Sequence, residues 1–341
     1  MKDNLKIPVN PSYHEVKSDY AKKWEENKSK EYKEYRKKWV KNPKNFILEK
    51  GPIHLDIEPT NACNLKCSMC PRTIMNDSPN SNFEVGYMDM NLYKSLIDQA
   101  AELGVYSIKL NWLGEPLLHE GIVKMIKYAK EKGIIDVMFN TNGTLLNEDI
   151  TIKLINAGLD KIFFSFDSPY KEKYEDIRVG ANYQEVLNNI TRVKKIREKL
   201  GKNNPLTRVS MVLMKNNQDD YDDFVELFKD KVDIIGYSYY MNHQEMIGEE
   251  EKVTTNKKIA NFACSQLWQR MFITWDGEIL VCCADDKREY VVGNANEDKL
   301  VNVWENKKYK YIRKKHKEGN YMDIDICSKC DLPTLQDDGD V

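Results

Sequence analysis

Residues 63–70 read Cys63-Asn64-Leu65-Lys66-Cys67-Ser68-Met69-Cys70, and the interpretation of the whole chain begins with them. Their thiols follow a C-x3-C-x2-C spacing in a chain of 341 residues that has eight cysteines. Three thiolates on one loop can hold three irons of a 4Fe–4S cube and leave the fourth iron open to a ligand. Zinc sites more often use C-x2-C pairs. The triplet therefore favours an iron–sulfur site at which chemistry takes place.

Composition limits the class of protein. Hydrophobic residues make up 41% of the chain and charged residues 31%, which is typical of a soluble globular protein. No apolar run approaches the roughly 20 residues of a membrane span, and the N-terminus lacks a signal-peptide core. We therefore expect a cytoplasmic protein with reduced cysteines that serve metal binding or catalysis. The net charge of −2 gives no indication of a nucleic-acid or membrane partner.

From residue 52 onward, short apolar runs alternate with amphipathic segments. We predict strands at Ile53–Glu58, Tyr106–Trp112, Asp136–Thr141, Lys161–Phe166, Arg208–Met214 and Val232–Tyr239. The helices between them include Asn91–Leu103, with Asn91 as its N-cap, Gly121–Glu131, Glu148–Ala157 and Tyr183–Lys199. Repeated β-α units imply an α/β fold with a parallel sheet, and six units are too few to close an eight-stranded barrel. The expected fold is a partial (β/α)6 TIM-like barrel whose first strand carries the cysteine loop at its reactive end.

Two further segments flank this barrel. Residues 12–41 place Tyr20/Trp24 and Tyr35/Trp39 four residues apart, which predicts aromatic pairs on one helix face. We expect a helical N-terminal extension over residues 1–50 that packs on the barrel or shapes the substrate mouth. The barrel is predicted over residues 51–245. A small C-terminal iron–sulfur module with a β-hairpin and a helix is predicted over residues 246–341.

The cysteine triplet, together with Gly114-Glu115-Pro116 after the second predicted strand, resembles the radical S-adenosylmethionine (SAM) superfamily. The resemblance extends over about residues 52–332. It implies a 4Fe–4S cluster held by Cys63, Cys67 and Cys70, with SAM bound to the open iron. It also implies a 5′-deoxyadenosyl radical that abstracts hydrogen from a substrate, and an electron donor of the flavodoxin or ferredoxin type.

The same resemblance implies SAM contacts at the ends of the strands. They are Met69, Gly114, Glu115, Asn140, Asn142, Ser165, Asp167 and Arg178. A glycine lets the backbone approach closely, a guanidinium suits a carboxylate, and methionine is a polarizable neighbour for adenine. Two alternatives stay open: Asp167 or Ser168 can instead cap the following helix, and Arg178 can be an ordinary surface residue.

A second set of cysteines lies in the last quarter of the chain. Its members follow C-x17-C-x44-C-x2-C and are Cys264, Cys282, Cys327 and Cys330. Met271–Trp275, the turn Asp276-Gly277 and Glu278–Cys283 predict a β-hairpin, and Leu300–Lys317 predicts a helix. This pattern is similar to the shortened SPASM, or twitch, module of radical SAM proteins, which implies an auxiliary 4Fe–4S cluster held by all four thiols. A closed zinc site is the alternative.

One cysteine, Cys283, belongs to neither set. Because it adjoins Cys282 on a predicted strand, we expect it to point to the opposite face. A thiol near a substrate radical can return a hydrogen atom, so Cys283 is a catalytic candidate in an epimerase, or else an inert buried residue. Arg270 and Asp285 are candidates for the base that a dehydrogenase needs.

The substrate class follows from the resemblance alone. The chain is similar to amino-cyclitol dehydrogenases and to aminoglycoside and sugar epimerases. This similarity implies a small polyol or amino-sugar substrate, which the enzyme either oxidises or inverts at a carbinol carbon. Peptide-modifying SPASM maturases and a metal-binding scaffold without catalysis are the alternatives. Aromatic and polar residues that could line a carbohydrate pocket are Trp112, Tyr239, Asn242, His243, Trp268, Gln269 and Arg270.

Overall fold

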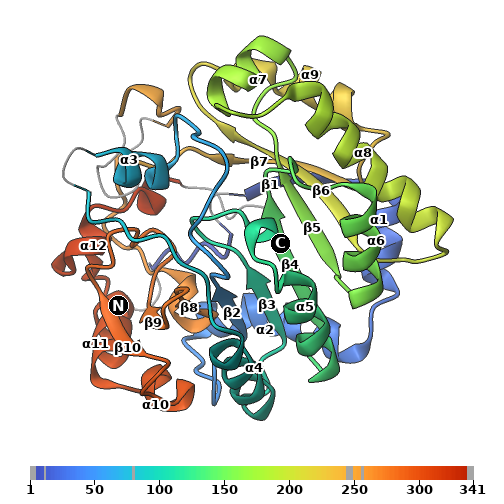
Figure 1. Cartoon of the computed structure of the whole chain (residues 1–341). Helices are drawn as coiled ribbons and strands as arrows, with labels where there is room; N and C mark the ends of the chain where they lie inside the picture. The colour runs from blue at the N-terminus through green and yellow to red at the C-terminus, as the bar shows by residue number, and fades with distance from the viewer. Residues whose placement is uncertain (1–4, 11–12, 79–80, 243–248, 255–256, 336–341) are drawn as a thin grey trace.

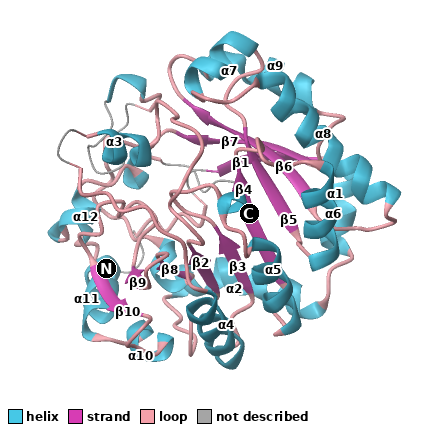
Figure 2. Ribbon diagram, in the orientation of Figure 1, coloured by secondary structure: helices cyan, strands magenta, loops and turns pink. Residues whose placement is uncertain are grey.

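The computed structural model describes residues 5–10, 13–78, 81–242, 249–254 and 257–335. Its frame is a ten-stranded sheet in the order β1-β7-β6-β5-β4-β3-β2-β8-β9-β10 (Figures 1 and 2). The strands are β1 (Tyr13–Lys17), β2 (His54–Ile57), β3 (Ser107–Leu110), β4 (Asp136–Thr141), β5 (Lys161–Ser165), β6 (Leu206–Leu213), β7 (Ile234–Tyr239), β8 (Arg270–Ile273), β9 (Glu278–Leu280) and β10 (Val291–Asn294).

The middle of the sheet is parallel, as predicted. Strands β2 to β7 pair in parallel in chain order, and β8 joins β2 on the other side, also in parallel. Antiparallel strands complete both ends, with β1 beside β7 and with β9 and β10 beyond β8. The predicted hairpin of β8 and β9 is therefore present, but it continues the main sheet. The division of the chain at residues 50 and 245 stays a prediction.

Helices surround this sheet (Figure 1). They are α1 (Asp19–Glu26), α2 (Lys30–Asn45), α3 (Pro71–Asp77), α4 (Met90–Leu103), α5 (Ile122–Glu131), α6 (Glu148–Ala157), α7 (Lys171–Ile177), α8 (Tyr183–Lys199), α9 (Tyr221–Phe228), α10 (Leu300–Trp304), α11 (Lys307–Lys317) and α12 (Asp325–Ser328). None of those described is long and apolar enough to cross a membrane.

The two faces of the sheet differ in chemistry because side chains alternate along each strand. The outer face meets α4, α5, α6 and α8 with fully buried apolar residues such as Ile108, Phe139 and Val209. The residues between them turn to the inner face, where Lys109 and Arg208 line a cavity. This inner face is the polar interior of the partial barrel.

The N-terminal segment closes the barrel at the amino ends of its strands. Trp24, Tyr35 and Trp39 are buried in one cluster with Ile53 and Leu206, which stand at or just before the start of β2 and β6. Three of the four aromatic residues predicted to pack are thus buried. The fourth, Tyr20, is 37% exposed.

Helix α4 begins earlier than predicted. Its N-cap is Asp89, whose Oδ1 accepts hydrogen bonds from the backbone N–H groups of Asn91 (2.7 Å) and Leu92 (3.2 Å). Met90 is already helical, so the unpaired amide groups of the first turn need an acceptor before it.

Replacing Asp89 with alanine is expected to lower the free energy of unfolding by about 1 kcal/mol, because two amide groups lose their acceptor. Asn91→Ala is the matched control. Asn91 is exposed inside the first turn and should be nearly neutral. Urea titration followed by circular dichroism measures both variants, and a larger loss at Asn91 would contradict this cap.

Candidate functional site

The first thiol set lies at the carboxyl end of β2, in the loop before α3. Two backbone hydrogen bonds tie this loop to the segment after α7: Lys66 N–H donates to Val179 O and Ser68 N–H to Ile177 O, both at 3.0 Å. Burial raises the pKa of Cys67 to about 12, and neighbouring thiols act in the same direction. Burial also raises the pKa of Cys63 and Cys70. Metal binding at this loop must therefore displace protons from these thiols.

The Gly-Glu motif packs directly against that loop. The Glu115 N–H donates to Ala62 O at 2.8 Å, one residue before the first cysteine. A Cβ on Gly114 would lie 2.1 Å from Thr60 O and 2.6 Å from Ala62 O, so only glycine fits here. The structure thus brings together two motifs that are about 50 residues apart in sequence.

The Glu115 side chain connects β4 to the same loop. Its carboxylate is 2% exposed and accepts hydrogen bonds from Thr141 Oγ1 and Asn142 N–H, both at 2.8 Å. Asn142 in turn donates its side-chain amide to Asn64 Oδ1 at 2.9 Å. Sequence reasoning missed Thr141 and Asn64, because their neutral side chains show no motif. Glu115 and Asn142 therefore position the cysteine loop through protein contacts.

Arg178 and Asp167 form a buried ion pair beside the loop. Arg178 Nη2 lies 2.6 Å from Asp167 Oδ2, and Arg178 Nη1 lies 3.8 Å from Cys67 Sγ. Asp167 is fully buried and Arg178 is 7% exposed, so Arg178 is no surface residue. The helix-capping alternative for Asp167 is wrong, since α7 begins after Tyr170 and has no side-chain cap.

Three further predicted residues lie near this edge. Met69 packs against Ile177, Met214 and Tyr240. Asn140 Oδ1 is buried on β4 without a hydrogen-bond partner. Ser165 ends β5 level with Ser210 of β6, whose buried hydroxyl also lacks a partner. Asn140 Oδ1 and Ser210 Oγ are thus buried polar atoms to which the described residues give no hydrogen bond.

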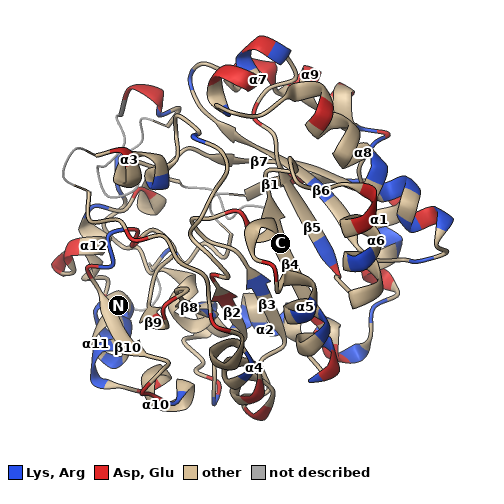
Figure 3. Cartoon of the chain, viewed as in Figure 1, with Lys and Arg blue, Asp and Glu red and all other residues tan. Residues whose placement is uncertain are grey.

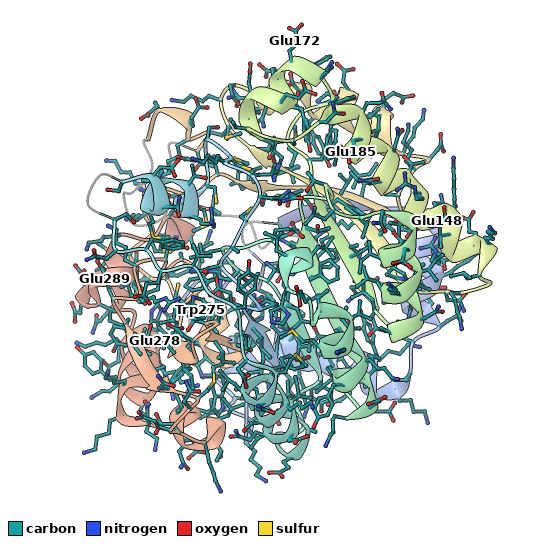
Figure 4. The ribbon with its side chains drawn as sticks, in the orientation of Figure 1. Glu148, Glu172, Glu185, Trp275, Glu278 and Glu289 are labelled. Carbon is teal, nitrogen blue, oxygen red and sulfur yellow. The ribbon has the colours of Figure 1, made fainter. Side chains whose placement is uncertain are left out.

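Glu58 is a buried carboxyl that sequence reasoning missed. It follows β2 and accepts hydrogen bonds from the N–H groups of Leu113 (3.3 Å) and Trp275 (3.2 Å), which joins the ends of β3 and β8 to β2. Burial raises the pKa of Glu58 to about 7. Trp275 lies inward of Glu278 and Glu289, toward the centre of the molecule (Figure 4).

The second thiol set gathers beyond β8. Cys264 precedes β8, Cys282 follows β9, and Cys327 and Cys330 lie in and just after α12. Burial raises the pKa of Cys264 and Cys330 to about 12 each, and nearby thiols contribute in the same direction. Cys264 and Cys330 also raise the pKa of Cys282 and Cys327, so these four thiols, which come from three separate segments, lie near one another.

His316 holds two members of this set in place. Its Nδ1 accepts a hydrogen bond from Cys264 N–H at 3.1 Å, and its Nε2 lies 3.4 Å from Cys327 Sγ. Burial lowers the pKa of His316 to about 4. The isolated histidine in the basic helix α11 carries no sequence signal for this role.

The expectation for Cys283 was wrong. Strand β9 ends at Leu280, so Cys282 and Cys283 lie in a turn where strand alternation does not apply. A hydrogen bond between the two thiols lowers the pKa of Cys283 to about 7 and raises that of Cys282. Cys283 also lies near Arg270 and Asp56, whose charges affect its pKa.

The two candidate bases occupy different surroundings. Arg270, on the inner face, lies 3.4 Å from Asp56, a carboxylate that sequence reasoning missed. Asp285 lies in the loop after Cys283 and accepts hydrogen bonds from Glu289 N–H and Tyr290 N–H, both at 2.8 Å. Arg270 is thus near enough to Cys283 to lower the pKa of its thiol, and Asp285 makes a loop-stabilising contact.

This geometry agrees with the comparisons with known proteins. A sequence model described as the radical SAM superfamily matches residues 57–228. The chain belongs to the radical SAM superfamily. A second model, SPASM, described as an iron–sulfur cluster-binding domain, matches residues 264–331. This radical SAM chain is thus an enzyme that uses SAM and a 4Fe–4S cluster, with a SPASM domain for auxiliary iron–sulfur binding.

Three relatives illustrate the range of this radical SAM family. A tungsten-containing aldehyde ferredoxin oxidoreductase cofactor-modifying protein of Pyrococcus furiosus is 25% identical, over 82% of this chain and 87% of its own. The SAM-dependent 2-deoxy-scyllo-inosamine dehydrogenase of Niallia circulans is 23% identical, over 83% and 94%. Its structure, BtrN with AdoMet and 2-DOIA, has a TM-score of 0.56 at 22% identity, over 83% and 94% of the two chains. Streptococcus suis SuiB bound to precursor peptide SuiA has a TM-score of 0.62 at 17% identity, over 89% and 75%.

The residues present fit the cofactors of this radical SAM family. The first set offers three thiols on one loop, a glycine position that no Cβ can occupy, and an arginine whose buried Nε has no partner. The second set offers four thiols that lie near one another and come from three segments. Within the described ranges, no three His, Cys, Asp or Glu side chains stand close enough to hold a single metal ion.

Several residues predicted to line a carbohydrate pocket have other surroundings. Trp268 is buried against Phe46, and Gln269 donates to Trp39 O at 2.8 Å, so both are packing residues. Trp112 donates its ring N–H to Cys283 O at 2.8 Å. Tyr239 stacks edge-on with His14, and Asn242 N–H donates to Asp331. His243 lies outside the described residues.

Proposed function

We propose that this enzyme abstracts a hydrogen atom from a carbinol carbon of a sugar-like or amino-cyclitol substrate and leaves a ketone. The observation that carries the proposal is the second thiol set, Cys264, Cys282, Cys327 and Cys330. Four thiols can ligate an auxiliary cluster completely, which leaves no open iron for substrate and suits an electron acceptor. A dehydrogenase needs such an acceptor. The similarity to a relative named as a dehydrogenase supports the same choice.

We assign Cys63, Cys67 and Cys70 to the SAM-binding cluster. When bound, SAM and the clusters supply a 5′-deoxyadenosyl radical for hydrogen abstraction and an acceptor for the remaining electron. Around them, Arg178 offers its unpartnered Nε to the SAM carboxylate. Gly114 would present its backbone to the amino group of SAM, Glu115 holds that segment in place, and Met69 would contact the adenine.

The remaining polar residues complete the site. We assign Asn140, Ser165 and Asp167, which lie at or just after the carboxyl ends of their strands, to the side where the ribose would bind, while Asn142 supports the cysteine loop. Removal of the substrate hydroxyl proton needs a base. We assign this step to Asp56, which stays ionised beside Arg270 on the inner face, whereas both carboxylate oxygens of Asp285 accept backbone hydrogen bonds.

The test uses anaerobically reconstituted enzyme, SAM and a chemical reductant with a panel of polyols and amino-cyclitols. We expect 5′-deoxyadenosine and ketone in equal amounts. A substrate deuterated at the carbinol carbon should transfer one deuterium to 5′-deoxyadenosine. SAM cleavage that yields a modified peptide and no ketone would rule the proposal out. The flavodoxin- or ferredoxin-type donor and the cytoplasmic location stay predictions.

A redox-neutral epimerase is the second candidate, because the Cys283 thiol lies near Arg270 and Asp56 at the inner face. In the dehydrogenase, Cys283→Ala should keep ketone formation within about threefold of wild type, since a substrate that loses its electron needs no hydrogen donor. The assay is ketone yield in deuterated water. Loss of a deuterium-labelled inverted product in this variant would instead establish the epimerase.

A further inference from the structure

Three cations meet on the inner face of the sheet, outside the two thiol sets. They are Lys109 on β3, Arg208 on β6 and Arg270 on β8, and they line a cavity of about 180 Å³ between the strands and the N-terminal segment. Figure 3 shows basic residues on β3 and β5 within the ring of helices, where a sheet would ordinarily be apolar. Buried positive charges on a sheet cost free energy unless they are paired, so the presence of these basic side chains needs an explanation.

The cavity has an excess of positive charge. Six Lys or Arg side chains line it against two Glu side chains. Two aspartates beside it pair with cations of the cavity: Asp56 with Arg270 at 3.4 Å and Asp136 with Lys161 at 2.6 Å. The described side chains therefore leave two positive charges without a negative counterpart.

Lys109 is the clearest of these uncompensated cations. Within the described ranges no carboxylate oxygen lies within 4.0 Å of its Nζ, which stands 5.9 Å from the centre of the Phe163 ring. Burial lowers the pKa of Lys109; Tyr13 and Asp56 act in the opposite direction, and nearby Arg208 and Arg270 add to the lowering. A buried ammonium group beside two guanidinium groups is costly unless an anion joins them.

The two arginines also have unused donors. Arg208 is 8% exposed, and its Nε has no hydrogen-bond partner; its guanidinium group contacts Tyr13, lies 3.9 Å from the centre of the Phe163 ring and 3.6 Å from Glu15. The Nε of Arg270 is likewise buried without a partner. Two guanidinium groups and one ammonium group facing one cavity are the donor set that binds a carboxylate or a phosphate.

The cavity lies at a useful distance from the cysteine loop. Val212, which donates its N–H to Asp167, follows Arg208 by four residues on β6, or about 13 Å of strand. Asp167 pairs with Arg178, which touches Cys67 Sγ. The unpartnered Ser210 Oγ lies between the two levels on β6, and the unpartnered Asn140 Oδ1 belongs to a residue that the strand register places level with Arg208. A polyol with an anionic end can therefore reach from the cations toward the site of hydrogen abstraction.

We propose that the substrate carries a carboxylate or phosphate group, which Lys109, Arg208 and Arg270 bind in the inner cavity. The ligand is thus an acidic or phosphorylated sugar-like polyol. This inference rests on the proposed function for the reaction, but the binding of the anion can be measured without turnover.

The test is calorimetric titration of the reconstituted full chain with SAM, at one fixed low ionic strength. The probes are galacturonate, galactose 6-phosphate, inorganic phosphate and galactose. We expect an acidic probe to bind at least tenfold more tightly than galactose. Lys109→Met should weaken this binding about ten- to a hundredfold, because a hydrogen bond to a charged group is lost. Tighter binding of galacturonate would identify the substrate's anionic group as a carboxylate, and tighter binding of galactose 6-phosphate would identify it as a phosphate.

Two comparisons keep the test decisive. Lys127→Met, on the outer surface of α5, removes the same charge and should leave affinity unchanged. Lys109→Arg should restore much of the binding that Lys109→Met loses. Equal binding of galactose and the acidic probes, or equal affinity in wild type and Lys109→Met, would overturn the inference. Anion binding that depends on Lys109 without any ketone product would instead reject only the proposed function.

Discussion

Replacing Cys327 and Cys330 together with alanine is expected to abolish ketone formation while SAM cleavage continues. Iron content should fall from about eight to about four per chain, because one of two 4Fe–4S clusters loses half of its ligands. The first thiol set is held by contacts to Ala62, Ile177 and Val179, and none of these involves the second set. The variant should therefore still produce 5′-deoxyadenosine, but without an acceptor for the second electron.

Iron and sulfide analysis after anaerobic reconstitution, with product analysis on the same samples, measures this effect. Cys283→Ala is the matched control: it removes a neighbouring thiol outside the four-residue set and should keep about eight irons. About four irons and one zinc in the wild type would leave the radical chemistry intact and remove the internal acceptor. The dehydrogenase proposal would then fall, and the epimerase would replace it.

Much of the fold could be predicted because its signals are local. Asp136–Thr141, Glu148–Ala157 and Tyr183–Lys199 form a strand and two helices with the predicted bounds. The strand β1 was missed because Tyr13–Lys17 shows no apolar alternation and pairs with β7, more than 200 residues away. The helix predicted over Leu300–Lys317 is two helices, since Asn306 caps α11 and interrupts it.

In the candidate site, too, the features with a local sequence pattern could be predicted and those that depend on distant contacts could not. Both thiol sets have a sequence spacing, and Gly114-Glu115 stands next to the first set as predicted. The pairing of Asp167 with Arg178, the contact of His316 with Cys327 and the position of Asp56 depend on how distant strands and helices meet. No local pattern contains that information. The misplaced expectation for Cys283 came from extending a strand by a few residues, which reverses the direction of a side chain.

The ion pair between Asp167 and Arg178 offers a way to separate stability from cofactor binding. Arg178→Met should lower the free energy of unfolding by about 3–5 kcal/mol, because Asp167 is then buried without its partner. The contact of Asp167 Oδ1 with Val212 N–H cannot compensate for the lost charge. Chemical denaturation of the apo chain measures this loss.

SAM affinity provides the second readout, because Arg178 Nη1 lies 3.8 Å from Cys67 Sγ and its Nε has no protein partner. Asp167→Asn/Arg178→Met removes both charges, so stability should return close to that of wild type. Equilibrium binding to the reconstituted double variant should still be about a hundredfold weaker, since the guanidinium that faces the SAM carboxylate is missing. Wild-type affinity in the double variant would show that Arg178 serves only to neutralise Asp167. Recovered stability with binding weaker than in Asp167→Asn alone would place Arg178 in contact with the cofactor, because both of these variants lack the Asp167 carboxylate.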